Sequence, residues 1–319
     1  MIDYISTIIH QGKSKPNLGH LQPDAQYSSG WQKYWLTGAE KIEVWYNPSS
    51  ELLRIQGSIA YFWKGHNFTC TRRDFREGID FLENILQVDL WRSDITQFEF
   101  GEIMQVDTKP KDYIKHHNIG TGEHLQANDR GKDKGNFRSW NEPNVRLKMY
   151  DASRNILMKQ GLQRQGIIEE AGWNPEGHFL KWEAHYVKPE VLNQGRALIL
   201  ANLVDRHWEE IFKADLYNQY KRLIPMKTIV TPTNKKDLGS ADIVLLSLAE
   251  LQINEGISLE ELKKILYDKI NSIPDEVLTK ADKDSRKRQI KAMLDKIVEE
   301  PESRWDLSEK LTEALKKDI

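Results

Sequence analysis

Apolar and polar side chains alternate along Leu180-Lys-Trp-Glu-Ala-His-Tyr-Val187. Successive side chains of an extended chain point to opposite faces, so this pattern predicts a strand with one face packed on a core. The other face then carries Lys181, Glu183 and His185 side by side. A carboxylate next to an imidazole on a stiff strand suits binding of a divalent cation, or acid–base chemistry.

A second predicted strand, Asp94-Ile-Thr-Gln-Phe-Glu-Phe-Gly101, offers another carboxylate. Its alternation places Gln97 and Glu99 on the face opposite two phenylalanines, which is typical of a sheet packed on a core. Glu102 competes with Glu99 for the same role. It follows Gly101, where the strand can bulge, and strict alternation puts it on the phenylalanine face. We therefore expect Glu99 to be the functional residue.

A third predicted strand, Val145-Arg-Leu-Lys-Met-Tyr150, places Arg146, Lys148 and Tyr150 on one face. If the first two strands are adjacent, Glu99, Glu183 and His185 form a site that suits Mg²⁺ or Mn²⁺ better than structural zinc. Tyr150 would then be a nucleophile for phosphorus, and Lys148 would offset charge on the phosphoryl oxygens. The alternative is that Tyr150 only packs.

The remaining patterns predict an α+β fold, an antiparallel sheet palm with flanking helices. The predicted elements are a hairpin of 41–46 and 52–62, a helix over 71–86 capped by Thr71, a long loop over 107–140, a helix from Asp151 or Ser153 to about 160, and two helices over 189–223. Pro, Thr, Asn and Lys cluster at 225–237, and the pattern beyond is helical, with segments at 241–252, 258–270, 274–299 and 306–317. We therefore expect a catalytic domain over 1–225 and a smaller, all-helical accessory domain over 226–319, which would bind DNA or a partner.

Composition excludes several classes of protein. The 319-residue chain has one cysteine, so it forms neither an intramolecular disulfide nor a cysteine-based zinc site. We find no signal peptide and no apolar run of membrane-spanning length, and we expect a cytoplasmic protein without membrane partners. The phosphate-binding loop of NTPases, the Gly-x-Gly-x-x-Gly fingerprint and the Gly-x-Ser-x-Gly elbow are also absent.

Positive charge is concentrated in one region, although the whole chain has a net charge of −2. Between Lys109 and Lys148, nine Lys/Arg face five Asp/Glu, a net charge of +4. Such a segment either contacts phosphates or is a solvated loop. The residues that we expect to contact DNA are Lys132, Lys134, Arg138, Arg146 and Arg154.

Four segments, taken together and in this order, resemble the gene II/gene X type replication initiation proteins of filamentous phages and their plasmid relatives. They are Ile55-Gln-Gly-Ser-Ile-Ala-Tyr-Phe-Trp-Lys-Gly-His-Asn67, Ile95-Thr-Gln-Phe-Glu-Phe-Gly101, Trp140-Asn-Glu142 with Val145-Arg-Leu-Lys-Met-Tyr150, and Phe179-Leu-Lys-Trp-Glu-Ala-His185. The likeness spans roughly residues 40–225. It departs from the family's pattern at Gln97 and His185, where an arginine is common, and at Ala152, where many relatives have a lysine. Lys148 or Arg154 would replace that lysine.

The resemblance implies a rolling-circle DNA replication initiator, a site-specific nickase and strand transferase. Such a protein cuts one strand of single-stranded or supercoiled origin DNA, keeps a 5′-phosphotyrosine on Tyr150, and leaves a 3′-OH for the host polymerase. A host helicase is a further expected partner. A covalent intermediate conserves the bond energy, which agrees with the missing NTPase loop. Two rival hypotheses are a metal-dependent phosphodiesterase that uses water, and a non-catalytic origin-binding accessory protein.

Overall fold

The computed structural model describes residues 1–10, 15–118, 127–128, 135–225, 247–249, 252, 257–294 and 305–316. The chain divides into two compact units. Met1–Ile224 and Leu307–Ile319 form the first unit, and Pro225–Asp306 forms the second.

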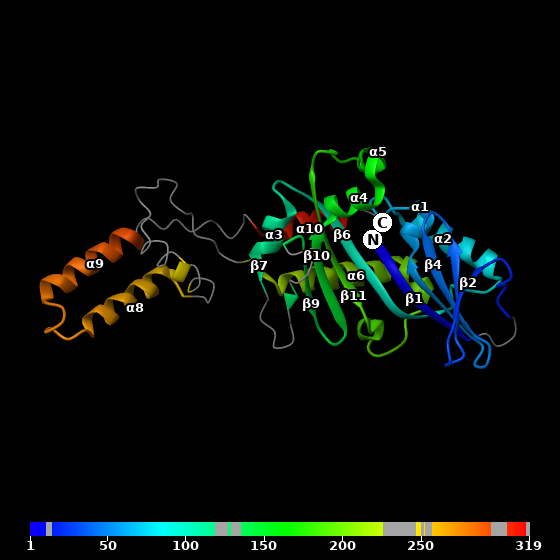
Figure 1. Ribbon diagram of the computed structural model, residues 1–319, viewed down its shortest axis with the longest axis horizontal. Coiled ribbons are helices and arrows are strands. Elements are labelled where there is room, and N and C mark those ends of the chain that lie inside the picture. The colour runs from blue at the N-terminus through cyan, green and yellow to red at the C-terminus, as the bar shows by residue number, and fades with distance from the viewer. Residues whose placement is uncertain are drawn as a thin grey trace. The chain divides into compact units, whose positions relative to one another are not determined.

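The first unit is built on an antiparallel sheet (Figure 1). Its strands are β1 (Ile2–His10), β2 (Gln22–Gln26), β3 (Gln32–Thr37), β4 (Lys41–Asn47), β5 (Leu52–Ser58), β6 (Asp94–Val106), β8 (Ala127–Asn128), β9 (Phe137–Asn141), β10 (Val145–Asp151) and β11 (His178–Tyr186). The order across the sheet is β2-β3-β4-β5-β1-β6-β11-β10-β9-β8, and β12 (Ile224–Pro225) pairs separately with β7 (His117–Asn118). The three strands that carry the candidate site residues, β6, β11 and β10, are therefore neighbours.

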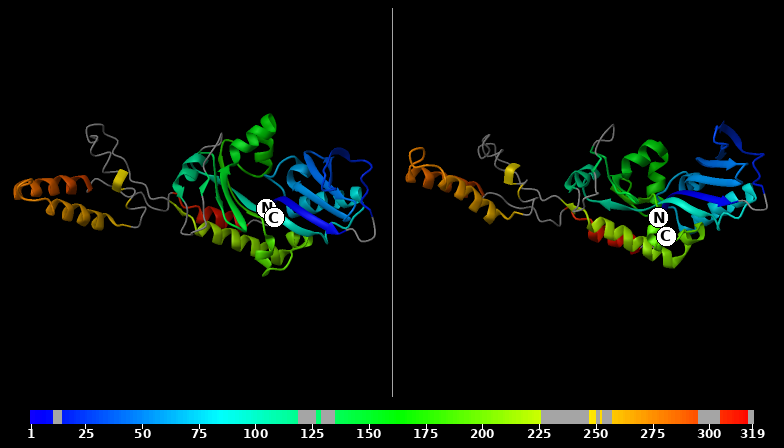
Figure 2. Two further views of the ribbon diagram at one scale, coloured as in Figure 1. Left: turned by 60° about the horizontal axis from the view of Figure 1, so that its bottom comes forward. Right: turned by 90° about the horizontal axis from the view of Figure 1, so that it is seen from below.

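Helices flank the sheet on both sides. They are α1 (Ile59–Lys64), α2 (Arg72–Leu86), α3 (Pro110–His116), α4 (Ala152–Gln160), α5 (Arg164–Glu170), α6 (Arg206–Lys221) and α10 (Ser308–Lys316), with 3₁₀ turns η1 (Gly161–Gln163), η2 (Pro189–Asn193) and η3 (Leu200–Val204). In Figure 2, α6 and α10 lie on one side of the sheet and α4 and α5 lie on the other. The antiparallel sheet with flanking helices confirms the predicted α+β class.

The predicted alternation of β11 holds in the structure. Trp182 donates its indole N–H to the Leu216 carbonyl of α6, and the Tyr186 hydroxyl donates to Asp215 of the same helix. Phe98 stacks on Tyr186 with ring centroids 4.8 Å apart, and these side chains form the core beneath α6. Lys181, Glu183 and His185 therefore face the opposite side of the sheet.

Side-chain caps fix where the main helices begin. Thr71 and Asp74 form a capping box at the start of α2, as the sequence predicts for Thr71. Asp151 caps α4 by accepting the backbone N–H of Arg154 at 2.9 Å. Because Asp151 also ends β10, this cap holds α4 directly after Tyr150.

Three local predictions need correction. The predicted strand 52–62 ends at Ser58, because the Ser58 hydroxyl accepts the backbone N–H of Tyr61 and starts α1 there. The predicted loop 107–140 contains α3, β7, β8 and β9. These elements are too short for their hydrophobic periodicity to be recognised in the sequence. The region 189–223 holds one long helix, α6, preceded by two 3₁₀ turns.

In the second unit, the structure describes two long helices, α8 (Leu259–Asn271) and α9 (Lys280–Leu294). Ser258 and Glu261 form the predicted capping box of α8. Leu262 and Leu294 are buried against each other's helices in a small apolar cluster. Most of the predicted helix over 241–252 lies outside the described residues. Within the described part of the chain, the helices lack the length and apolar character needed to cross a membrane.

The last helix departs from the predicted accessory domain of 226–319. Leu307 and Leu311 are buried in the first unit, and the backbone N–H of Leu307 donates to the Tyr220 hydroxyl of α6 at 2.7 Å. Helix α10 therefore completes the apolar side of the first unit, although it follows the second unit in sequence.

This arrangement predicts different results for two truncations. Ending the chain after Pro225 removes α10 and should cost about 4 kcal/mol of unfolding free energy, since two buried leucines are lost. Replacing residues 227–304 with a short Gly/Ser linker keeps α10 and should change that free energy by less than about 1 kcal/mol. Urea unfolding of both variants checks this. Equal losses in the two variants would show that α10 does not stabilise the first unit.

Candidate active site

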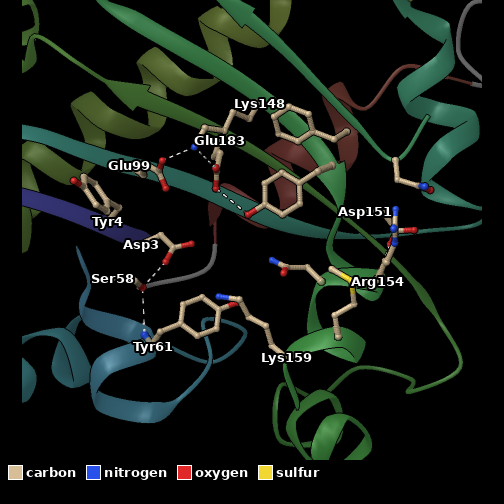
Figure 3. Close-up of a pocket in the computed structure, with 15 residues that line it drawn as sticks. Asp3, Tyr4, Ser58, Tyr61, Glu99, Lys148, Asp151, Arg154, Lys159 and Glu183 are labelled. Atoms are coloured by element: carbon tan, nitrogen blue, oxygen red, sulfur yellow. Dashed lines mark hydrogen bonds and ion pairs between the residues drawn. The ribbon is translucent and has the colours of Figure 1, made fainter. Parts of the chain in front are cut away.

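A cavity of about 460 Å³ lies on the polar face of the sheet, between β1, β6, β10 and β11 and the helices α1 and α4 (Figure 3). Its lining joins residues that are far apart in sequence. They are Asp3, Tyr4, Ser58, Tyr61, Glu99, Asn136, Phe137, Lys148, Tyr150, Asp151, Arg154, Asn155, Met158, Lys159 and Glu183. The first helical turn after β5 and the helix after β10 thus border a pocket whose floor is the sheet itself.

Three carboxylates converge on the floor of the cavity. One oxygen each from Asp3, Glu99 and Glu183 lies within 4.8 Å of the other two. Glu183 is only 2 % exposed and Asp3 is buried as well. A buried cluster of like charges is unfavourable unless cations share it, so the cluster needs either basic side chains or a metal ion.

Two lysines supply positive charge to this cluster. The Lys181 ammonium lies 2.6 Å from Asp3 and 2.8 Å from Glu183, and its side chain is 1 % exposed. Lys148 contacts Glu99 and lies 3.1 Å from Glu183. Burial alone would lower the pKa of each lysine, but the neighbouring carboxylates raise both above the ordinary value. Both lysines are therefore charged at neutral pH.

Tyr150 reaches the same cluster. Its hydroxyl donates to Glu183 at 3.1 Å, and its ring lies 5.7 Å from the Lys181 ammonium. Burial, and then the negative charge of Glu183, raise the pKa of Tyr150 well above its usual value. The phenol is therefore protonated at neutral pH, and Glu183 is placed to take its proton.

Asp3 is held by neutral donors as well as by Lys181. The Ser58 hydroxyl donates to one oxygen at 2.6 Å, and the Asn67 amide donates to the other at 2.6 Å. Burial alone would raise the pKa of Asp3, but Lys181 and these hydrogen bonds lower it to about 2. The Gly65-His66-Asn67 turn thus has a definite role, since Gly65 ends α1 at φ 79° and Asn67 orients Asp3.

His185 lies at the border of the cluster, and Asp3 is the third residue that contributes an oxygen to it, beside Glu99 and Glu183. The role of His185 as a metal ligand stays a prediction. His185 Nδ1 is 2.6 Å from Glu99, and its ring stacks on Tyr4 with centroids 5.6 Å apart. Burial by itself would raise the pKa of Glu99, but the bond to His185 and the charge of Lys148 lower it. The imidazole thus positions Glu99 in this arrangement.

The five residues predicted to contact DNA lie in different places. Arg154 lines the cavity. Arg146 is exposed on β10, opposite His185 of β11, beyond the residues that line the cavity. Arg138 pairs with Met149 and donates to the His117 carbonyl, so it lies on the apolar side of the sheet, away from Tyr150. The alternation of β9 puts it there, and the predicted contact of Arg138 with DNA stays a prediction. Lys132 and Lys134 lie outside the described residues.

Of the two glutamates that the sequence offered, Glu99 lines the cavity and Glu102 does not. Glu102 is buried against the chain's N-terminal ammonium, 2.6 Å away, and does not line the cavity. Gly101, directly before it, lies opposite Glu183 in the β6–β11 pairing. A Cβ atom at Gly101 would come within 2.4 Å of the Glu183 Cβ and 2.7 Å of the Trp182 carbonyl oxygen. Only glycine lets β6 approach the Glu183 backbone this closely.

We expect Gly101→Ala to lower the free energy of unfolding by about 1–3 kcal/mol, because the backbone of one strand must move. The same movement would displace Glu183 from the carboxylate cluster. The matched control is Gly166→Ala in α5, where an added Cβ meets nothing within 4 Å. It should be neutral or slightly stabilising. Chemical unfolding of both variants checks the pair, and equal stability would contradict the tight approach at Gly101.

Asp3 should make the protein acid-sensitive. Its pKa is lowered from 3.8 to about 2 by folding, so its contribution to stability is present above about pH 4 and is lost as the pH falls through 2. The shift corresponds to about 2 kcal/mol. We expect Asp3→Asn to be less stable than wild type at pH 5 and to lose about 2 kcal/mol less between pH 5 and pH 2. Parallel acid-unfolding curves for the two proteins would show that Asp3 titrates normally.

Sequence reasoning missed two residues of this site. Asp3 lies in Met1-Ile-Asp-Tyr-Ile5, where a single acidic residue among apolar ones was the available signal. Lys181 was placed on the correct face of β11 but was given no role. Both depend on contacts between β1 and β11 side chains, 178 residues apart in sequence.

No protein family model, curated protein or solved structure matches this chain.

Proposed function

We propose that this chain is a metal-dependent DNA nickase and strand transferase of the rolling-circle type, with Tyr150 as its nucleophile. One observation carries the proposal. The Tyr150 hydroxyl, three carboxylates and Lys148 share one cavity, with Arg154 at its border. The resemblance to replication initiation proteins of filamentous phages supports the choice of a DNA substrate over other phosphodiesters.

The donor atoms of the cluster fit a hard divalent cation. Mg²⁺ and Mn²⁺ prefer carboxylate oxygens, and Asp3, Glu99 and Glu183 would hold such an ion. The ion would supply positive charge to the scissile phosphate. Lys148 already bridges Glu99 and Glu183, so the ion would compete with its ammonium for these two carboxylates.

The residues of the chain supply the remaining chemistry. Glu183 accepts the phenolic proton as the Tyr150 oxygen attacks phosphorus, a contribution typical of general bases at about 10²–10⁴ in rate. The bond from phosphorus to the 3′-oxygen breaks, and that oxygen gains a proton from water to become a 3′-OH. Lys148 and Arg154 offset charge on the phosphoryl oxygens. Attack by the 3′-OH reverses the step and releases Tyr150.

The proposal is tested by incubating the protein with single-stranded oligonucleotides that are labelled at the 3′ end and tile its own replicon, with Mn²⁺ or with a chelator. A labelled protein band that survives SDS and requires the metal is the expected result. Binding without a covalent band or cleavage, under any divalent ion, would favour a non-catalytic origin-binding protein.

A second candidate function is a phosphodiesterase that uses water. The raised pKa of Tyr150 and its bond to Glu183 favour it, because a protonated phenol is well suited to holding Glu183 in place. This candidate predicts free cleaved DNA without a covalent protein band.

A further inference from the structure

Tryptophans and cations lie side by side on the face of β3, β4 and β5. The Lys33 ammonium is 4.1 Å from the centre of the Trp35 ring and 5.2 Å from that of Trp45. The Arg54 guanidinium lies 5.2 Å from the Trp31 ring, and Tyr27 lies 5.3 Å from Trp45. We call Tyr27, Trp31, Lys33, Trp35, Trp45 and Arg54 the aromatic face.

The aromatic face and the floor of the cavity are parts of the same side of one sheet. Directly paired residues of neighbouring strands point to the same side, and the register pairs Lys33 with Trp45 and Trp45 with Arg54. On the next pair of strands, Ser58 lies opposite Tyr4, and both line the cavity. At about 4.8 Å between strands, four strand spacings separate β3 from β6, a path of about 19 Å.

The two sides of β4 and β5 differ sharply in burial. Val44 and Leu53, on the far side, are fully buried, whereas Trp45 and Arg54 are half-buried. Tyr27 is 44 % exposed. The Arg54 Nε, enclosed by neighbouring side chains, has no hydrogen-bond partner among the described residues. Large aromatic side chains left in contact with water are typical of a binding surface.

We propose that the aromatic face binds unpaired DNA and leads one strand into the cavity at Tyr150, an inference that rests on the proposed function. Unpaired bases stack on aromatic rings with little sequence preference, and nearby cations bind the phosphates between them. A duplex is not recognised in this way, because its bases are already stacked on each other. The long side chain of Lys33 can move away from the Trp35 ring, so that a base stacks on the ring while the ammonium contacts a phosphate.

The charges on this face favour stacking as the main source of affinity. Glu43 and Asp24 lie 3.0 and 3.5 Å from the Lys33 ammonium and offset its charge. Arg54 has no ion pair among the described residues and supplies a free positive charge beside Trp31. Binding should therefore fall less steeply with salt than in proteins that rely on many phosphate contacts.

The test is fluorescence anisotropy with a labelled 20-nucleotide oligo(dT) and with a labelled duplex of the same length, in a chelator so that no cleavage occurs. We expect Trp45→Ala to weaken binding of the single strand by about 5- to 150-fold, and Trp35→Ala to act similarly. Trp45→Phe should restore most of the affinity, which excludes misfolding as the cause. Wild type should prefer the single strand over the duplex.

The matched control is Trp208→Ala. Trp208 is a half-buried tryptophan of α6, on the other side of the sheet, where it stacks on Phe212. Its loss should leave binding of oligo(dT) unchanged. Wild-type affinity in both Trp35→Ala and Trp45→Ala, or equal affinity of wild type for single strand and duplex, would overturn the inference.

The two proposals fail separately. If Trp45→Ala forms the covalent band and binds the single strand as tightly as wild type, Tyr150 remains the proposed nucleophile and binding of DNA at the aromatic face is rejected. Tryptophan-dependent binding of the single strand without any covalent band would retain the aromatic face and reject the nickase.

Discussion

Tyr150→Phe is expected to lower formation of the covalent protein–DNA band by at least about a thousandfold, since no other group would replace the attacking oxygen. The ring of Tyr150 and its contacts with Phe137, 6.4 Å away between centroids, remain. The loss of the hydrogen bond to Glu183 costs about 1 kcal/mol. The variant should therefore fold and bind DNA as wild type does.

Tyr61→Phe provides a matched control in the same cavity. Tyr61 also lines the cavity, but its hydroxyl donates to Asn67 at 3.3 Å and does not contact the three carboxylates. We expect this variant to form the covalent band within about tenfold of wild type, because its effect on Asp3 is indirect. A covalent band in Tyr150→Phe equal to that of wild type would reject Tyr150 as the nucleophile. Cleavage without a covalent band, in both wild type and Tyr150→Phe, would indicate that water is the nucleophile.

Strand periodicity predicted the parts of the site that depend on a single strand. Glu99, Tyr150 and Glu183 were placed by alternation alone, and the structure brings them into one cavity because β6, β11 and β10 are neighbours. Alternation is a local property, so it can be read without knowing which strands pair. The capping residues Thr71 and Ser258 were readable for the same reason.

Strand order, in contrast, is decided by packing between distant segments. Asp3 belongs to the site only because β1 lies between β5 and β6, and no pattern in Met1–Ile5 indicates that neighbour. The same reason hid the role of Lys181, whose partner Asp3 is on another strand. The side of the sheet on which Arg138 lies could not be read from the sequence, because β9 was not recognised as a strand.

Lys181→Met should cause the largest loss of stability among the substitutions considered, about 3–5 kcal/mol, because it leaves two buried carboxylates without the cation that they share. Methionine retains most of the length of the side chain, so the loss reflects charge more than volume. The effect should be greatest near neutral pH and smaller in acid, where Asp3, once it has lost Lys181, can take up a proton. Urea unfolding at pH 7 and pH 4 measures both values.

Two further variants separate charge from packing. Lys111→Met, at an exposed position of α3, should change stability by less than about 0.5 kcal/mol. Adding Asp3→Asn to Lys181→Met should recover part of the loss, because one of the two unpaired charges is removed. If the two residues do not interact, the losses of unfolding free energy in Asp3→Asn and in Lys181→Met will simply add up in the double variant.

Lys181→Met also tests whether the carboxylate cluster holds a divalent cation. In wild type, Lys181 and Lys148 already neutralise much of the charge on Asp3, Glu99 and Glu183. Without Lys181, the three carboxylates should attract Mn²⁺ more strongly, and an ion that binds only the folded state adds stability in proportion to the logarithm of its concentration. We therefore expect Mn²⁺ to raise the melting temperature of Lys181→Met more than that of wild type, and Glu99→Gln in the same background to remove the difference. An equal change of melting temperature with Mn²⁺ in all three proteins would mean that these carboxylates form ion pairs with the lysines and do not bind the metal ion.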